Sequence, residues 1–345
     1  MEKVFVVTNS LTGGGAERAM NLLCSEISQQ NQSNFQITLV PINQGPRDLV
    51  EPNCRVIQIG RMWRGNFSNS LFSYLKFVSL VVREKPKVII LNCALPELFA
   101  CFIPVKTSFV VVEHSRNPWL GRESLGLVVR RILKLRKSTF IAVSAHLKVW
   151  SLPEIKTRTI PNPIFQVIRY PKNKNGKSIK RLVFIGRLAA DKNPQAFIGI
   201  LGRLQYPGLV IGGGALMEEL KNRSASNLSN VEFAGYCFEP WKLLKDGDLL
   251  IVPSKFEGDG LVIAEAVLGG FPLLVSQISE FRKFHLSEYC YCDTEEDFVA
   301  RIQEFSLKID DLIPATLTVE LLKSERGIDA IGNTWRELIQ KLITT

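Results

Sequence analysis

Two glutamates eight positions apart, Glu257 and Glu265, stand in a glycine-rich segment where an apolar strand pattern gives way to a helical one. Gly258 and Gly260 allow the backbone to approach a ligand closely. The first turn of the new helix exposes unpaired N–H groups and a partial positive charge, which together indicate a seat for a diphosphate. Carboxylates accept hydrogen bonds from hydroxyl groups, so Glu257 is a candidate for binding a sugar and Glu265 for binding a ribose. The alternative is that both are ordinary solvated acids.

A basic pair, Arg187 and Lys192, follows another predicted strand, within the segment Phe184–Asn193. Two fixed cations can neutralise the charge that builds on a departing diphosphate, a role that a divalent ion fills in other enzymes. By default, such residues belong to the solvated surface. Their position near the glutamate segment favours the functional interpretation, in which no metal is required.

The elements that position these residues alternate between strand and helix. In the first half, strands are predicted at Lys3–Thr8, Phe35–Ile42, Arg55–Ile59, Lys87–Asn92, Ser108–Val112 and Thr139–Val143. In the second half, they are predicted at Arg181–Ile185, Leu209–Gly212, Val231–Phe233, Leu249–Val252 and Pro272–Ser276. Near-continuous apolar strands separated by helices indicate parallel sheets covered on both faces. The sequence therefore predicts an α/β protein with two Rossmann-like, doubly wound domains, and a ligand site in the cleft that they face.

The length of 345 residues suits two domains. We place the first at residues 1–165 and the second at residues 166–325. A C-terminal helix, residues 326–345, is expected to pack back toward the first domain. The polar stretch Arg169–Lys180 is predicted to be the linker.

The net charge of +10 is unevenly distributed. Residues 1–165 contain 21 Lys and Arg against 10 Asp and Glu, whereas residues 166–345 contain 22 against 23. A positive field confined to one domain indicates an anionic partner, either a phospholipid surface or a nucleic acid. No recognisable nucleic-acid module is present, so a nucleic-acid-binding protein is disfavoured.

The N-terminal apolar run Val4–Val7 is too short for the core of a signal peptide. The longest apolar region, Val88–Val112, is interrupted by prolines and charged residues, and so does not form the roughly 20-residue apolar helix of a bilayer crossing. Seven cysteines without a Cys-X-X-Cys pair are typical of buried thiols in a reducing compartment. We expect a cytoplasmic protein with no membrane span.

The segment Pro253–Ala266 resembles the two-glutamate motif of glycosyltransferase family 4, whose members are retaining enzymes of the GT-B fold. Other pieces are similar to that family in the same order, namely Gly14–Arg18, Val112–His114, Val143–Ser144, Ile160–Asn162, Phe184–Asn193 and Gly269–Ser276. The resemblance runs from residue 4 to about residue 280.

The resemblance implies a role for each matching residue. Glu257 would contact the donor sugar, Glu265 the ribose, and Arg187 and Lys192 the departing diphosphate. The loop and helix residues expected near the phosphates or the sugar are Gly14, Gly15, Gly258, Asp259, Gly260 and Leu261. Most family members have an apolar or aromatic residue in place of Asp259.

His114 ends a predicted strand, where a residue facing the cleft would stand. Family members often have a histidine there, so we assign His114 a catalytic role rather than a structural one. No set of histidines and cysteines has the spacing of a zinc site. The Asp246–Asp248 segment imitates a metal-binding Asp-X-Asp motif, but it precedes a strand instead of following one. We therefore expect no metal and no cofactor besides the donor substrate.

The predicted function is retaining hexosyl transfer from a nucleotide-diphospho-sugar, with uridine diphosphate as the expected nucleotide, to a hydroxyl of a lipid-linked glycan. The product would be a cell-surface polysaccharide or lipopolysaccharide. One alternative is a nucleotide-sugar epimerase of similar fold, for which Glu113 and His114 could supply acid and base. Another is a transferase that acts on a small soluble acceptor.

An amphipathic helix is predicted at Glu123–Lys137. At about 100° per residue, its apolar face comprises Leu125, Val128, Val129, Ile132 and Leu135, and its basic face comprises Arg130, Arg131, Lys134 and Lys137. A solvated basic face is the simplest interpretation. The functional interpretation adds that this face meets anionic headgroups, so that the enzyme is peripheral on the inner face of the cell membrane. The nearby aromatic residues are attributed mainly to core packing, and they are Trp63, Phe67, Phe72, Tyr74 and Phe77.

Overall fold

The computed structural model divides the chain into two compact units. It describes residues 1–11, 14–29, 34–45, 54–62, 67–147, 149–155, 157–164, 168–171, 178–227 and 230–344. The first domain comprises Met1–Pro163 together with Arg326–Thr345, and the second comprises Ile164–Glu325. Within the described ranges, none of the helices combines the length and apolarity that a bilayer crossing requires.

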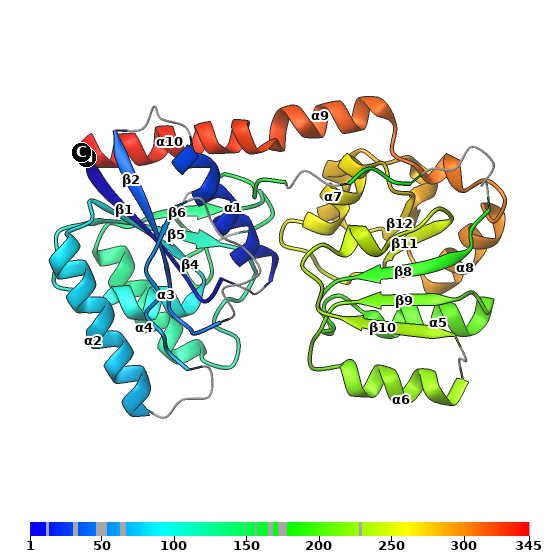
Figure 1. Cartoon of the computed structure of the whole chain (residues 1–345), viewed down its shortest axis with the longest axis horizontal. Coiled ribbons are helices and arrows are strands. Elements are labelled where there is room, and N and C mark those ends of the chain that lie inside the picture. Colours follow the sequence, from blue (N-terminus) through cyan, green and yellow to red (C-terminus); the bar gives the residue numbers. More distant parts are fainter. Residues whose placement is uncertain are drawn as a thin grey trace. The chain divides into compact units, whose positions relative to one another are not determined.

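The first domain contains a seven-stranded parallel sheet in the order β3-β2-β1-β4-β5-β6-β7 (Figure 1). Its strands are β1 (Glu2–Thr8), β2 (Phe35–Pro41), β3 (Arg55–Val56), β4 (Val88–Asn92), β5 (Ser108–Glu113), β6 (Thr139–Ala142) and β7 (Arg158–Thr159). Because neighbouring strands run in parallel, the carboxyl ends of β1, β4 and β5 meet at one edge of the sheet.

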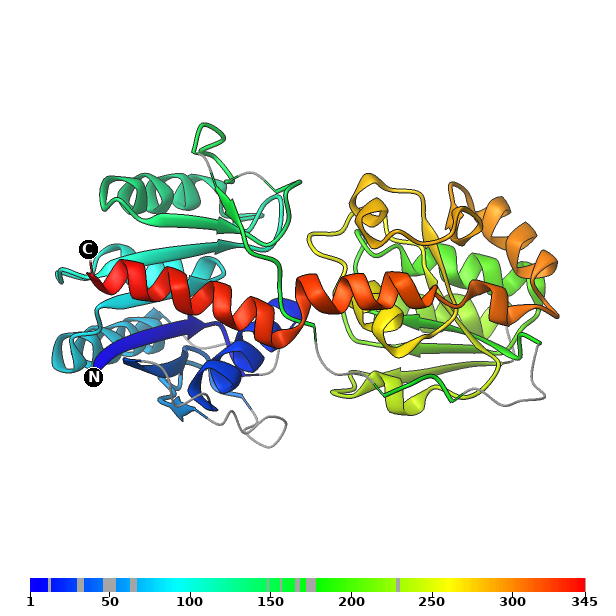
Figure 2. The same ribbon diagram turned by 90° about the horizontal axis from the view of Figure 1, so that it is seen from above.

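Helices cover both faces of this sheet. They are α1 (Gly15–Gln29), α2 (Phe67–Glu84), α3 (Ala94–Cys101), α4 (Glu123–Leu135) and α10 (Ile328–Thr344). Side chains of α2, α3 and α4 join one hydrophobic core with the strands, whereas α10 contacts α1 on the opposite face (Figures 1 and 2). The C-terminal helix thus completes the first domain rather than the second.

The second domain contains a six-stranded parallel sheet in the order β10-β9-β8-β11-β12-β13. Its strands are β8 (Arg181–Ile185), β9 (Gly208–Ile211), β10 (Val231–Gly235), β11 (Asp248–Val252), β12 (Leu273–Ser276) and β13 (Tyr291–Cys292). Its α-helices are α5 (Pro194–Leu204), α6 (Met217–Asn227), α7 (Leu261–Gly269), α8 (Glu295–Glu304) and α9 (Thr316–Arg326). Short 3-10 helices are η1 (Pro240–Leu243), η2 (Ser279–Phe284), η3 (Glu288–Cys290) and η4 (Ile309–Leu312).

The predicted α/β architecture is confirmed, and each predicted strand occurs within a few residues of its expected bounds. The linker prediction for Arg169–Lys180 is wrong, because the described part of that stretch belongs to the second domain. Tyr170 is buried in the core of that domain, where its ring contacts Phe271 and its hydroxyl accepts a hydrogen bond from the Gly247 amide at 2.8 Å. The change of domain occurs earlier, between Pro163 and Ile164.

Arg130 does not lie on a solvated basic face, and that prediction is wrong. Its side chain is fully buried beneath α4, where Nε and Nη2 donate to the two oxygens of Glu97 at 2.7 and 2.8 Å. Nη1 also pairs with Glu113 at the end of β5. Without a cation beside them, the buried carboxylates of Glu97 and Glu113 would be strongly destabilising. Their pairing with Arg130 therefore favours an orientation of α4 in which this arginine faces the core.

The helix α4 is therefore rotated from its predicted orientation. The residues that it buries are Gly126, Val129, Arg130 and Leu133. Three residues predicted for the core face, Leu125, Val128 and Leu135, are exposed instead. Phe67 and Phe72 of α2 are likewise exposed, whereas Phe77 is buried; Trp63 lies outside the described residues.

Candidate functional site

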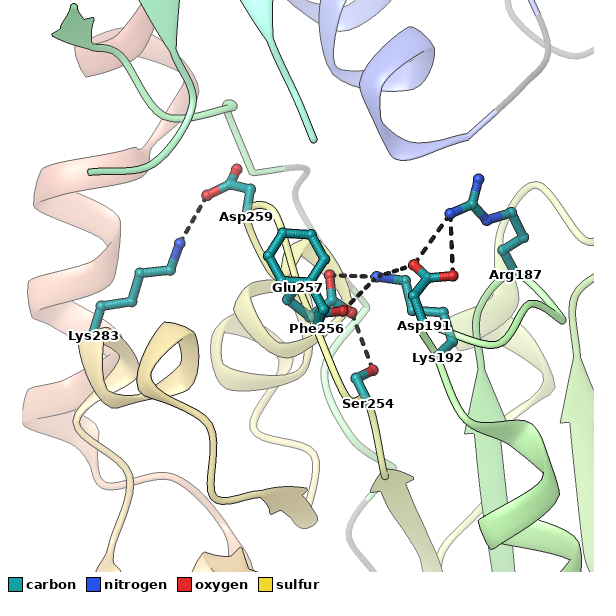
Figure 3. A network of polar contacts seen from close by, with 8 residues as sticks. All are labelled: Arg187, Asp191, Lys192, Ser254, Phe256, Glu257, Asp259 and Lys283. Atoms are coloured by element: carbon teal, nitrogen blue, oxygen red, sulfur yellow. Dashed lines mark hydrogen bonds and ion pairs between the residues drawn. The ribbon is translucent and has the colours of Figure 1, made fainter. Parts of the chain in front are cut away.

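Two loops of the second domain lie side by side because their strands are neighbours in a parallel sheet. The loop after β8 carries Arg187 and Lys192, and the loop after β11 carries Glu257 (Figure 3). Parallel pairing places the carboxyl ends of both strands at the same edge. Arg187 and Glu257, about 70 positions apart in the sequence, are thus brought to the same edge of the sheet, just before the amino end of α7.

The charged side chains of these loops form one network (Figure 3). Lys192 Nζ lies 2.8 Å from Glu257 Oε2 and 3.4 Å from Asp191 Oδ2, and Arg187 Nη2 lies 3.2 Å from the same Asp191 oxygen. The side chains of Lys192 and Glu257 are 19% and 14% exposed, whereas that of Arg187 is 67% exposed. Lys192 and Glu257 therefore form the inner, partly desolvated pair, and Arg187 stands at the rim.

Backbone contacts join the two loops. The Asp191 carbonyl accepts hydrogen bonds from the amides of Lys255 at 2.9 Å and Phe256 at 3.3 Å. Lys192 Nζ donates to the Phe256 carbonyl at 3.3 Å, and Ser254 Oγ donates to Glu257 Oε1 at 3.3 Å. Asp191 and Ser254 were not identified from the sequence, although both lie in segments that carry the family resemblance.

Two glycines at the end of β9 seat the loop that carries Arg187. A Cβ atom at Gly212, where φ is +144°, would lie 1.8 Å from the Gly186 carbonyl oxygen. At Gly214 it would lie 2.4 Å from the Leu188 carbonyl oxygen. Only glycine allows such an approach of two backbones. The position of Arg187 thus depends on a segment that had no assigned role in the sequence.

The amino end of α7 has the features expected of an anion seat. Gly260 is its N-cap, in the left-handed conformation at φ +71°, and Leu261 begins the helix. A Cβ on Gly260 would lie 2.9 Å from the Phe284 ring, so this position requires glycine. The first helical amides have no partner within the helix and carry the positive end of its dipole.

Asp259, the residue that departs from the family pattern, is buried and takes part in an ion pair separate from the network of Lys192 and Glu257. Its Oδ1 lies 3.0 Å from Lys283 Nζ, which comes from η2 (Figure 3). Lys283 had no assigned role in the sequence, and its neighbourhood contains no motif. The pair balances a carboxylate that would otherwise oppose an anion at the end of α7.

Glu265 lies apart from the charged network. It is buried within α7, and its Oε2 accepts a hydrogen bond from Trp241 Nε1 of η1 at 2.7 Å. The buried partner fixes the direction of the carboxylate. Its predicted contact with a ribose stays a prediction.

The residues predicted in the first domain gather at the carboxyl edge of its own sheet. His114 directly follows β5, and its Nε2 contacts Asn92 Oδ1 at the end of β4. Asn92 Nδ2 in turn lies 3.4 Å from the Ala16 carbonyl oxygen, one residue after Gly15 begins α1. Asn92 therefore connects His114 to the first turn of α1, which begins at Gly15, although Asn92 was not predicted from the sequence to be a site residue.

A buried charge cluster lies beneath His114. Glu97 and Glu113 share the single guanidinium of Arg130, and Trp119 Nε1 donates to Glu97 at 3.1 Å. Burial raises the pKa of Glu97 to about 7 and also raises the pKa of Glu113. Because Glu113 is buried in this cluster, it does not reach the carboxyl edge as a solvent-facing acid or base.

The Asp246–Asp248 segment lies at the amino end of β11, whereas Glu257 follows the carboxyl end of the same strand. Asp248 begins β11 and accepts two hydrogen bonds from Arg181, at 2.6 and 2.9 Å, while Asp246 pairs with Lys180 at 3.0 Å. In the described part of the chain, no group of three or more His, Cys, Asp or Glu side chains is arranged to hold a metal ion.

Comparison with known proteins places this geometry in a family context. Residues 179–306 match the family model described as "Glycosyl transferases group 1". The chain is 22% identical over 281 residues to the GalNAc-alpha-(1->4)-GalNAc-alpha-(1->3)-diNAcBac-PP-undecaprenol alpha-1,4-N-acetyl-D-galactosaminyltransferase of Campylobacter jejuni, covering 77% of each chain. It is 28% identical over 128 residues to the O-antigen biosynthesis glycosyltransferase WbnH of Escherichia coli, covering 37% of this chain and 36% of that protein.

The fold is similar to that of HepE from Anabaena, whose crystal structure contains UDP and glucose. The TM-score is 0.74 at 15% identity, and the match covers 99% of this chain and 100% of that one. The predicted GT-B fold, with two Rossmann-like domains, is thereby confirmed.

Proposed function

We propose that this chain is a glycosyltransferase that transfers a hexose from a uridine diphosphate donor to a hydroxyl of a lipid-linked glycan, with retention of configuration. The match of residues 179–306 to the model of glycosyl transferases group 1 supports this activity. The Lys192–Glu257 pair near the amino end of α7 carries the proposal, because it combines a cation, a carboxylate and helix N–H groups. HepE, crystallised with UDP and glucose, supports the choice of nucleotide. The undecaprenol-linked substrate named for the Campylobacter enzyme supports the acceptor, and the name of WbnH supports a product in O-antigen or related cell-surface glycan.

Donor binding, on this proposal, exchanges partners within the network. The diphosphate accepts hydrogen bonds from the amides of Asp259, Gly260 and Leu261, and it pairs with the cations Lys192 and Arg187. The sugar hydroxyls take Glu257, which is paired with Lys192 at 2.8 Å in the free protein. Partner exchange keeps the carboxylate and the ammonium compensated in both states, so neither is left desolvated and alone. Gly258 allows the close approach, and Glu265 binds the ribose.

The chemistry then requires positioning and charge stabilisation. As the bond between the sugar and the diphosphate breaks, negative charge grows on the leaving phosphate, where the end of α7, Arg187 and Lys192 stabilise it. The acceptor hydroxyl attacks from the same face, and its proton passes to the leaving phosphate oxygen. His114 contributes to catalysis from the carboxyl edge of the first domain's sheet, where Asn92 holds its imidazole. The enzyme acts at the inner face of the cell membrane, where its acceptor is anchored.

A panel of nucleotide-sugars tests this function directly. The correct donor, at a hundred times its dissociation constant, should raise the free energy of unfolding by roughly 2.7 kcal/mol, measured as a thermal shift. Turnover of that donor with a glycan acceptor, followed by NMR assignment of the product anomer, tests retention. If no nucleotide-sugar shifts the melting transition, the proposal fails. An inverted product would remove the retaining mechanism alone.

We also propose that the reaction needs no metal, because Arg187, Lys192 and the helix end supply the positive charge. Transfer should therefore proceed at an undiminished rate in EDTA, measured as product formed per minute after exhaustive chelation. Loss of activity that magnesium or manganese restores would contradict this proposal and would reopen the search for carboxylate ligands.

A further inference from the structure

Helix α2 is apolar on two opposite sides. It buries Phe77, Leu80 and Val81 in the core of the first domain. On the far side, Phe67 is 84% exposed, and Leu71 and Leu75, which follow at intervals of four residues, are also exposed. Side chains spaced by four share one helix face. An apolar face that the domain itself does not cover indicates a second binding environment.

Helix α4 repeats this arrangement. Its core face is formed by Val129 and Leu133 together with the buried Arg130. Its outer face exposes Val128, and Leu135 is 82% exposed at the last helical position. The rotation that buries Arg130 is therefore the same rotation that presents these apolar side chains to the outside.

Both outer faces belong to the same side of the sheet. Helices α2, α3 and α4 pack into one core, with ring contacts from Tyr74 and Phe77 of α2 to Phe99 of α3, and with α3 packed on α4 (Figure 1). Phe102, which follows the last residue of α3, is also exposed. We define the outer helix face by six of the exposed apolar residues of this layer, which are Phe67, Leu71, Phe72, Leu75, Val128 and Leu135.

The charges around the outer helix face are mainly positive. Arg83 on α2 and Arg131 and Lys134 on α4 are exposed. Lys76 on α2 is also exposed, although its Nζ donates to the Ile59 carbonyl at 2.8 Å. Lys134 pairs with Glu154 at 2.6 Å across an exposed contact, and such pairs are readily exchanged for other anions. The two helices contain two acids. Glu84 is paired with Lys3, Arg55 and Arg83, and Glu123 is exposed.

This combination of exposed apolar and basic side chains distinguishes between two possible binding partners, a second copy of the chain and an anionic bilayer. A two-fold contact with a second copy would bring the same basic side chains toward one another. An anionic bilayer offers phosphates to the basic groups and acyl chains to the apolar ones. We propose that the outer helix face docks the first domain on an anionic phospholipid surface, with Leu71, Leu75, Val128 and Leu135 inserted at the level of the headgroups. The inference rests on the proposed lipid-linked acceptor and names the surface that brings the enzyme to it.

The test is sedimentation of the full chain with vesicles of phosphatidylcholine alone or mixed with phosphatidylglycerol. Wild type should bind the mixed vesicles. The double substitution Leu71→Asp with Leu75→Asp, or Val128→Asp with Leu135→Asp, should lower the partition coefficient at least tenfold, since buried apolar area is lost. Arg131→Gln should lower it about fivefold, on mixed vesicles only. The control is Leu317→Asp on α9, which changes a leucine about as exposed as Leu135, and this variant should bind like wild type.

Parallel measurements separate the possible failures. None of the substituted residues lies in the charged network of the second domain, so melting temperature and turnover with a soluble acceptor should match wild type. Equal vesicle binding by wild type and both double variants would overturn the inference, as would no binding by wild type. A dimer that the double variants dissociate, without any vesicle binding, would assign the face to a second copy. Vesicle binding without turnover of any nucleotide-sugar would instead reject the proposed function and leave the docking surface standing.

Discussion

Lys192 and Glu257 compensate each other in the second domain, and Asp191 and Ser254 set their directions. A lysine that approaches two carboxylates is oriented by both, and partial burial strengthens each contact. The network is therefore pre-organised before any donor arrives. Its two inner members can be replaced individually without disturbing a hydrophobic core.

Glu257→Gln and Lys192→Ala should each lower kcat/KM for transfer by about 100-fold or more, because each removes a charged contact made at the reacting end of the donor. The melting temperature should change little. Arg203→Ala is the matched control, since Arg203 forms a comparable surface pair with Glu296 at 2.7 Å, remote from the loops, and should retain full activity. Near-normal turnover of either site variant would remove that residue from the proposed donor site.

Asp259 and Lys283 form a second charge pair whose effect on the donor is testable. Lys283→Ala removes the neighbouring positive charge from the Asp259 carboxylate near the proposed diphosphate seat, so the affinity for the nucleotide-sugar should fall about tenfold. In the double variant with Asp259→Asn, the repulsion is gone and the affinity should return, as titration calorimetry would show. If the double variant binds as weakly as Lys283→Ala, then Lys283 contacts the ligand itself and the compensation argument is wrong.

At the scale of elements, one buried cluster ties helices α3 and α4 to strand β5. Glu97 from α3, Glu113 from β5 and Arg130 from α4 are all buried, and together they hold two acids against one cation. Such a set titrates as a unit. The cluster lies under the turn that carries His114, so it orients the end of β5 as well as stabilising the helix layer.

The raised pKa of Glu97 makes the stability of the first domain depend on pH. A carboxyl whose folded pKa lies near 7 is favoured in its protonated form, so its contribution is fully present below about pH 4.5 and is lost as pH rises through about 7. Urea unfolding should show that the free energy of unfolding of the first domain falls as pH rises between these limits. Glu97→Gln, which cannot ionise, should reduce this pH dependence and leave the part that Glu113 contributes. An unchanged slope in that variant would assign the dependence to other groups.

At the scale of the whole molecule, the chain passes between the domains twice, after Pro163 and after Glu325. Arg326 Nη2 donates to the Asn162 carbonyl at 3.2 Å, so the outgoing and returning segments are joined within the first domain. The returning helix α10 buries Ile331, Trp335 and Ile339 against that domain. Helices from the two ends of the sequence, α1 and α10, thus pack against each other in the first domain.

Trp335→Ala should therefore destabilise the first domain by roughly 3–5 kcal/mol, since it deletes a large buried side chain. The second domain should keep its own unfolding transition, because Trp335 belongs to the other unit. Urea unfolding followed by circular dichroism would resolve the two transitions. Glu337→Ala, an exposed position on the same helix, is the control and should leave both unchanged. A shift of both transitions in Trp335→Ala would show that the domains unfold together.

The sequence alone was enough to predict the strands, their parallel arrangement and the loops in which Arg187, Lys192 and Glu257 stand. Each strand is a short, nearly continuous apolar run, and each of these residues follows its strand directly. Once β8 and β11 are neighbours in a parallel sheet, their carboxyl ends must meet. Local pattern and topology together therefore bring the candidate site residues close to one another without any knowledge of side-chain contacts. Their chemical roles stay predictions.

Only the tertiary structure decided which partner each charge takes and which way each helix turns. The periodicity of α4 placed Arg130 on a solvated face, because a helical wheel treats every charge as facing water. Glu97 and Glu113 come from an earlier helix and strand, and their buried carboxylates make the core the favourable place for this arginine. The same holds for Lys283 beside Asp259. Pairing between buried charges depends on desolvation and on neighbours distant in sequence, neither of which a local pattern contains.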